Sequence, residues 1–165
     1  MTILVAYTSK HGSTEGIAKA IADRLVERGK EVDLRRVDGA TDLASPEAVV
    51  LGSAVYVGSW MTEALEFAMA YRDTLATIPV WLFSSGPLGT QVEDEDEQPK
   101  QLQALRDAFA PRDHRMFYGA LDPDELGFGE RLMVKAIKAP IGDFRDWDAI
   151  GAYADEMADA LDQAP

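Results

Sequence analysis

The most informative segment of the chain lies at its beginning, where Ile3-Leu4-Val5-Ala6-Tyr7 is followed at once by Thr8-Ser9-Lys10-His11-Gly12-Ser13-Thr14. A continuous apolar run of this length is typical of a strand that is buried on both faces of a sheet. The polar part that follows contains one glycine and four hydroxyl side chains. A helical pattern starts directly after it, so we expect a strand, a tight loop and a helix in this order.

The helix after this loop is expected between residues 13 and 28, where apolar side chains recur at every fourth position. Ser13 or Thr14 can cap its first turn through a hydroxyl group, and Gly29 can end it. A helix N-terminus presents unpaired N–H groups and the positive end of the helix dipole, which attract anions. The loop therefore predicts a phosphate site, although helix capping and chain turning alone would use the same residue types.

Two common phosphate-binding motifs do not fit this loop. A Walker loop requires Gly-Lys followed by Ser or Thr, whereas Gly12 is followed directly by Ser13 and Thr14. The dinucleotide fingerprint requires three spaced glycines, and Gly12 and Gly16 do not form it. The phosphate of a mononucleotide is the better fit.

Strand and helix patterns alternate through the rest of the chain, which predicts an α/β fold. We expect residues 1–165 to form a single domain, a doubly wound five-stranded parallel sheet of order 2-1-3-4-5 with helices on both faces. The further strands are expected at residues 31–37, 48–55, 80–83 and 115–121, and the further helices at 62–76, 99–109, 128–138 and 147–161. In the helix at 62–76, the side chains expected to face inward are Leu65, Ala68, Met69 and Leu75.

Ligands of doubly wound sheets bind beyond the carboxyl ends of the strands. Three loops leave those ends, at residues 8–14, 54–60 and 84–89, and all three are rich in glycine and hydroxyl side chains. Tyr56 and Trp60 offer aromatic surface for a flat ring, although ordinary packing around a helix start would also use them. The candidate binding residues are Ser9, Lys10, His11, Gly12, Ser13, Thr14, Ala54, Val55, Tyr56, Val57, Gly58, Trp60, Ser84, Ser85, Gly86, Pro87, Leu88 and Gly89.

The segment from Tyr7 to Glu15 resembles the phosphate loop of flavodoxins, which has a hydroxyl residue, two variable positions, a glycine, a variable position and a threonine. The resemblance implies a flavodoxin-like fold that binds FMN at the switch point between the first and third strands. It also implies that Ser9, Ser13, Thr14 and the nearby N–H groups surround the FMN phosphate. Because the flavin carries the chemistry, no catalytic side chain is expected.

Within this superfamily, the second loop and the helix pattern after it are more similar to the menaquinone-dependent protoporphyrinogen oxidase branch than to carrier flavodoxins. In that branch a long basic segment, linked to quinone or membrane contact, precedes the closing helix. Here the corresponding segment is shorter and includes a basic helix face at residues 128–138. The resemblance implies an FMN-dependent oxidoreductase that transfers electrons between an organic substrate and a quinone-like acceptor.

The alternative is a flavodoxin-type carrier of single electrons that docks to a protein partner. The formal net charge of −13 favours a basic partner and disfavours nucleic acid. The acidic run at residues 93–97 is typical of a solvated loop, or serves as a docking patch for such a partner. The sequence leaves the oligomeric state open, and a homodimer is compatible with it.

Composition excludes several other classes. The chain has no cysteine and only two histidines, His11 and His114, so thiolate nucleophiles and Cys- or His-based metal clusters are not expected. A receiver domain of the same topology needs acidic residues where Thr8-Ser9 and Ser53-Ala54 stand. No apolar run reaches the ~18 residues of a membrane-spanning helix, and no basic segment precedes the first strand, so we expect a cytoplasmic protein.

Overall fold

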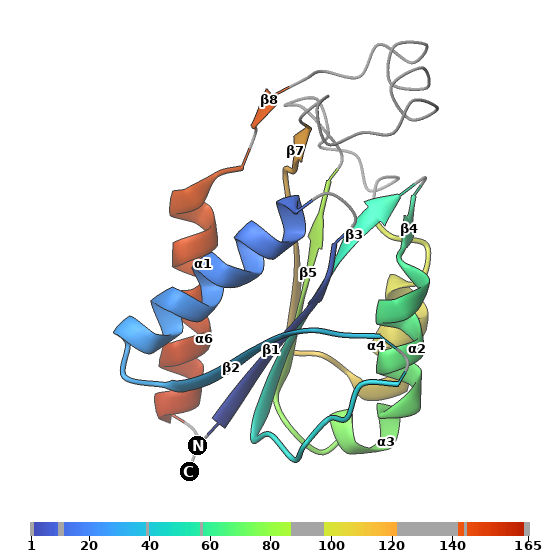
Figure 1. Ribbon diagram of the computed structural model, residues 1–165. Coiled ribbons are helices and arrows are strands. Elements are labelled where there is room, and N and C mark those ends of the chain that lie inside the picture. Colours follow the sequence, from blue (N-terminus) through green and yellow to red (C-terminus); the bar gives the residue numbers. More distant parts are fainter. Residues whose placement is uncertain are drawn as a thin grey trace, which may run out of the picture.

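The computed structural model describes residues 2–9, 12–38, 40–56, 58–86, 98–121, 142–143 and 145–163 (Figure 1). Its main sheet has the parallel order β2-β1-β3-β5-β6, which confirms the predicted order of the five strands. Strands β1, β3 and β5 lie inside, and β2 and β6 lie at the edges. These strands span Thr2–Thr8 (β1), Glu31–Arg36 (β2), Ala48–Tyr56 (β3), Val80–Ser85 (β5) and Asp113–Phe117 (β6).

Helices cover both faces of this sheet, which explains why the inner strands read as continuous apolar runs (Figure 1). One core cluster joins the sheet to α1 (Ser13–Glu27) and α6 (Trp147–Gln163). The other joins it to α2 (Thr62–Ala70), α3 (Arg72–Leu75) and α4 (Leu102–Phe109). Side chains of β1 alternate between the two clusters, as the pleat of a strand requires.

The predicted helix at residues 62–76 is interrupted at Tyr71, which has φ −113° and ψ 17°. The Tyr71 hydroxyl donates a hydrogen bond to the Thr41 carbonyl oxygen at 3.1 Å, and this contact holds the break against the loop after β2. The prediction that Met69 faces inward is wrong, since 37% of it is exposed. Phe67, two residues earlier and on another side of the helix, is fully buried instead.

Residues 56–61 are more regular than the sequence predicts. A short strand, β4 (Ser59–Trp60), runs antiparallel to the end of β3, pairing Val55 with Trp60 and Tyr56 with Ser59. Gly58 lies in the connecting turn with φ +75°, a conformation that glycine adopts without strain. The hairpin folds Trp60 back towards the sheet.

The predicted last strand, residues 115–121, divides in two. Its first part belongs to β6 of the main sheet, and β7 (Ala120–Leu121) pairs antiparallel with β8 (Gly142–Asp143). The Gly86 N–H donates to the Phe117 carbonyl oxygen at 2.9 Å, so the chain leaves β6 beside the end of β5. The acidic run at residues 93–97 and the helix predicted at 128–138 lie outside the described residues.

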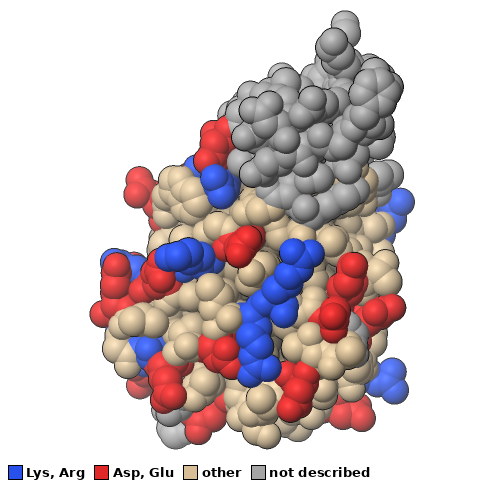
Figure 2. Space-filling model, viewed as in Figure 1, with Lys and Arg blue, Asp and Glu red and all other residues tan. Residues whose placement is uncertain are grey.

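The surface is strongly charged. Figure 2 shows acidic side chains spread over the visible face, with a group of basic side chains crossing its centre over β2. Between α1 and α6, Arg24 binds both carboxylate oxygens of Asp155, at 2.8 and 2.9 Å, and Arg28 adds a third contact. These two arginines lower the pKa of the Asp155 carboxyl group, mainly through their hydrogen bonds.

Candidate functional site

A row of buried hydroxyl groups crosses the carboxyl ends of the three inner strands. The register places Thr8 of β1 beside Ser53 of β3, and Ser53 beside Ser84 of β5. Their exposed fractions are 1%, 0% and 0%. We call these three residues the hydroxyl row. It lies where the apolar runs end, so the sequence signal for it is the hydroxyl residue that closes each run.

The hydroxyl row ties the first loop to the second. The Thr8 hydroxyl donates to the Ser53 oxygen at 3.1 Å, and the Ser53 hydroxyl donates to the Ala54 carbonyl oxygen at 2.8 Å. The backbone N–H of Met61 also donates to the Ser53 oxygen, at 3.0 Å. Ser53 therefore links the ends of β1 and β3 to the residue that precedes α2.

Trp60 joins the second loop to the third. Its indole N–H donates to the Ser84 oxygen at 2.8 Å, and the same oxygen lies 2.7 Å from Nε2 of His114 on β6. Burial, with a smaller contribution from the Arg106 charge, lowers the pKa of His114 to about 4. The ring is therefore neutral at pH 7, and its tautomer decides whether Nε2 accepts a hydrogen bond from the Ser84 hydroxyl or donates one to it.

This arrangement separates the two aromatic residues of the second loop. Trp60 is 3% exposed, and its indole N–H already donates a hydrogen bond to Ser84, so Trp60 anchors the second loop to the sheet. Tyr56 is 40% exposed and stands at the end of β3. Tyr56 is therefore the aromatic side chain of this loop that a ligand can reach.

Among the described residues, no side chain caps the N-terminus of α1. The residue at the N-cap position is Gly12, with φ +83°, and not Ser13 or Thr14 as predicted. Ser9 lies before the helix, and its hydroxyl oxygen accepts a hydrogen bond from the Gly12 N–H at 2.9 Å. Because Gly12 has no side chain to cap the first turn, the helix end offers backbone donors to an anion.

Two hydroxyl groups of the first helical turn are placed for a ligand. The Ser13 oxygen lies 3.4 Å from that of Ser85, so the first loop meets the third. Thr14 is fully buried, and its Oγ1 has no hydrogen-bond partner within the described structure. Leaving a buried hydroxyl unpaired costs about 1–3 kcal/mol. The donor set therefore fits a bound phosphate that completes these hydrogen bonds, as the predicted FMN would.

Comparison with known proteins agrees with this geometry. The chain matches the flavodoxin domain family over residues 4–148. It belongs to that family. No helix among the described residues of this flavodoxin domain is long and apolar enough to cross a bilayer.

Relatives of this flavodoxin domain cover it almost completely. Protoporphyrinogen IX dehydrogenase (quinone) of Escherichia coli strain K12 is 22% identical over 99% of this chain and 98% of the relative. A flavodoxin from the domain Archaea superposes with a TM-score of 0.63 at 14% identity, over 99% of this chain and 100% of that one. The flavodoxin, WrbA-like protein from Agrobacterium tumefaciens gives 0.62 at 15% identity, over 99% of both chains. The predicted fold and the predicted similarity to the protoporphyrinogen branch are confirmed.

The described part of the flavodoxin domain brings most of the candidate residues to one edge of the sheet. They are Ser9, Gly12, Ser13, Thr14, Ala54, Val55, Tyr56, Gly58, Trp60, Ser84, Ser85 and Gly86, at or beyond the ends of β1, β3 and β5. The remaining candidates, Lys10, His11, Val57, Pro87, Leu88 and Gly89, lie outside the described residues.

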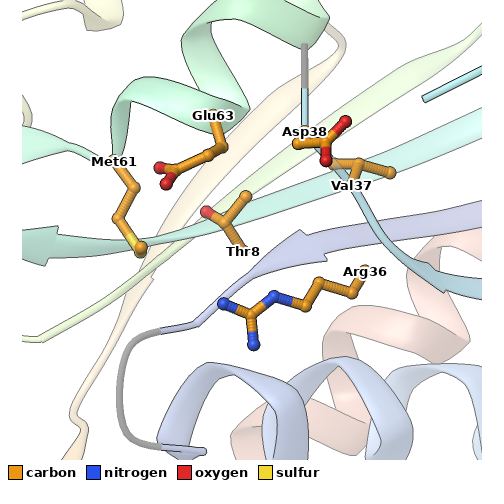
Figure 3. A pocket seen from close by; sticks show the side chains of 6 residues that line it. All are labelled: Thr8, Arg36, Val37, Asp38, Met61 and Glu63. Atoms are coloured by element: carbon orange, nitrogen blue, oxygen red, sulfur yellow. The ribbon is translucent and has the colours of Figure 1, made fainter. Parts of the chain in front are cut away.

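Sequence reasoning missed a pocket beside this edge. It has a volume of about 270 Å³ and opens between the ends of β1 and β2 and the start of α2 (Figure 3). Arg36 ends β2 in register with Tyr7. Its place near the end of the strand predicted at residues 31–37 is the sequence signal that could have located it at the same edge. The residues lining the pocket are Thr8, Arg36, Val37, Asp38, Met61 and Glu63.

Proposed function

We propose that this flavodoxin domain binds FMN where its three loops meet and uses it to transfer electrons between an organic substrate and a quinone-like acceptor. One observation carries the proposal. The first turn of α1 combines a glycine at the N-cap position, a buried Thr14 hydroxyl without a described partner and the Ser13–Ser85 contact. This combination of hydrogen-bonding groups at a helix N-terminus suits the phosphate of a mononucleotide.

The residues have distinct roles in this proposal. Ser9, Ser13, Thr14 and the first N–H groups of α1 bind the phosphate, with Lys10 and His11 at the rim of the same loop. Tyr56, Gly58 and Gly86 lie around the flavin ring. Trp60 and Ser84 hold the second and third loops in place through their hydrogen bond. When bound, FMN supplies the electron transfer, and the protein binds it, orients it and excludes water.

The choice of acceptor rests on the relative in Escherichia coli, whose name specifies quinone. Its similarity extends over nearly the whole of both chains, so the same type of acceptor is our first choice.

A second function is a carrier of single electrons between proteins. The net charge of −13 favours it, because a surface of one sign attracts a basic redox partner. In that case the flavin would meet a protein rather than a small organic substrate.

Absorption spectroscopy separates these outcomes. We would add FMN to the flavin-free protein, remove the excess, and photoreduce the complex stepwise under anaerobic conditions. We expect bound flavin that passes directly to the two-electron-reduced form and is then reoxidised rapidly by menadione. Accumulation of a one-electron-reduced flavin, without turnover of menadione, would establish the carrier instead. If no FMN binds at micromolar concentration, the proposed function is wrong.

A further inference from the structure

The pocket beside the phosphate loop has one arginine, Arg36, among its lining residues. Arg36 lines the pocket and is exposed, and it forms no ion pair with any described residue. The preceding residue, Arg35, provides a direct contrast, because its guanidinium binds the Asp33 carboxylate and the Asp42 carbonyl oxygen. In a chain with 29 acidic residues, an arginine at a ligand edge without such a partner is available to an external anion.

The direction of the side chain supports this availability. In Figure 3 the Arg36 side chain extends from β2 along the end of β1, near Thr8. The pKa of the Tyr7 hydroxyl is raised by burial and by Glu15, and the positive charge of Arg36 opposes that rise. The guanidinium group therefore acts electrostatically at the end of β1, next to the proposed phosphate site.

The opposite wall of the pocket is acidic. Glu63, in the first turn of α2, points towards Thr8 and Met61 (Figure 3), and it forms no ion pair with the described residues. Asp38 is already engaged, since its carboxylate accepts hydrogen bonds from the Ala40 N–H and the Thr41 hydroxyl. Glu63 and Arg36 thus line the same pocket of about 270 Å³, the first from α2 and the second from β2.

The volume limits what can enter. Sites for whole drug-sized ligands measure about 300–1,000 Å³, so this pocket fits one polar group or arm of a ligand. A guanidinium group pairs with carboxylate, sulfonate or phosphate through two parallel N–H donors. The Glu63 carboxylate repels a second negative charge and favours a ligand whose remaining polar groups are donors.

We propose that the pocket between β1, β2 and α2 is a subsite for an anionic group of a small-molecule ligand, with Arg36 as its counter-charge and Glu63 as the opposing charge. This subsite adds a specificity element to the proposed function, and the identity of its ligand rests on that function. Two kinds of ligand have such an anionic group. One is the flavin cofactor, through its phosphate, and the other is a substrate or acceptor with an acidic substituent.

Two matched ligand pairs test the proposal and distinguish the sources. The first pair is FMN and riboflavin, which differ by the phosphate, with dissociation constants measured from flavin fluorescence. The second pair is 1,4-naphthoquinone-2-sulfonate and menadione, of which only the sulfonate is charged. Binding of the quinones is followed by the amide NMR shifts of Val37 and Met61 in the protein with and without FMN.

The variants are Arg36→Gln and Glu63→Gln, with Arg72→Gln as the matched control. Arg72 carries the same charge on an exposed side chain, and its helix α3 lies at the opposite end of the sheet (Figure 1). We expect Arg36→Gln to weaken the anionic member of one pair roughly tenfold and to leave its uncharged partner unchanged. Glu63→Gln should strengthen binding of the same anion, and Arg72→Gln should change neither ligand.

The ligand pair whose charged member binds more weakly to the Arg36→Gln variant identifies the source of the anion. The inference is overturned if Arg36→Gln changes neither anionic ligand, or weakens charged and uncharged members equally. Opposite effects of the two pocket variants cannot arise from loss of folding, and thermal melting of each variant checks this directly. If the wild-type protein binds no flavin, the proposed function fails, but the quinone pair still decides whether the subsite exists.

Discussion

Thr14 is the residue at which stability and function are most clearly opposed. Its hydroxyl group is buried at the start of α1 without a described partner, while its methyl group packs in the interior. An unpaired polar group destabilises a protein, whereas an apolar group of the same shape does not. In the proposed function, the hydroxyl group therefore contributes to the stability of the FMN-bound protein and not to that of the free one.

We predict that Thr14→Val raises the stability of the flavin-free protein by about 1 kcal/mol and weakens FMN binding. Riboflavin, which has no phosphate, should bind with unchanged affinity. Urea denaturation and flavin fluorescence measure the two effects. A loss of stability together with equal weakening of both flavins would mean that Thr14 has a purely structural role.

His114 makes the stability of the protein depend on pH. Its pKa is lowered from 6.5 to about 4 by burial, so the unfolded chain takes up the proton first as the pH falls. The stabilisation is complete above pH 6.5 and is lost progressively as the pH falls from 6.5 to about 4. Its size is at most about 3 kcal/mol.

We predict that His114→Gln, which cannot titrate, flattens the stability curve in this pH range. The difference between wild type and variant isolates the histidine from the carboxylates, which titrate in both proteins. Urea denaturation at half-unit pH steps from 4 to 7.5 measures it. Parallel curves for the two proteins would contradict the assignment of this pH dependence to His114.

Among the elements, β3 and β5 depend on one glycine for their close packing. A Cβ atom on Gly52 would lie 2.0 Å from the ring of Phe83, the neighbouring residue on β5. Both residues stand directly before the hydroxyl row, so a shift of either strand would displace Ser53 and Ser84. The glycine thus sets the spacing at the site.

We predict that Gly52→Ala destabilises the protein by about 1–3 kcal/mol, the usual cost of overpacking a core. The same change should cost clearly less in a Phe83→Leu background, because the clashing ring is absent. A double-mutant cycle from urea denaturation measures this coupling. Strictly additive effects would show that the ring is not the source of the strain.

At the scale of the whole molecule, the net charge of −13 is a source of self-repulsion. Salt at 0.15 M reduces the Debye length to about 8 Å and screens charges across the surface. The exposed ion pairs between α1 and α6 are weakened at the same time, but such pairs contribute little each. Relief of the general repulsion should therefore dominate.

We predict that the melting temperature rises when sodium chloride is added from 10 to 150 mM at pH 7, a range over which screening increases strongly. Glu66→Gln, at an exposed position of α2, should raise the melting temperature at low salt and reduce this dependence. Differential scanning calorimetry measures both. A fall in melting temperature with salt would mean that specific ion pairs outweigh the net charge.

The sequence by itself determined the strand order, the three loops at one edge and the family. Apolar periodicity depends on neighbouring residues, so local patterns were sufficient to locate the strands and helices. The general rule for doubly wound sheets then supplied the order of the strands. The same reasoning failed at the break at Tyr71, the exposure of Met69 and the division of the last strand. At these positions contacts with distant segments outweigh the local preference.

Only the tertiary structure decided how the residues of the site are used. Ser53 and Thr8 are 45 positions apart, and Trp60 and Ser84 are 24 apart, so their hydrogen bonds follow from strand register. Packing between the sheet and its helices also buries Trp60, leaves the Thr14 hydroxyl without a described partner and places Arg36 and Glu63 along one pocket. Such contacts depend on packing between segments, which no local pattern of residue types specifies.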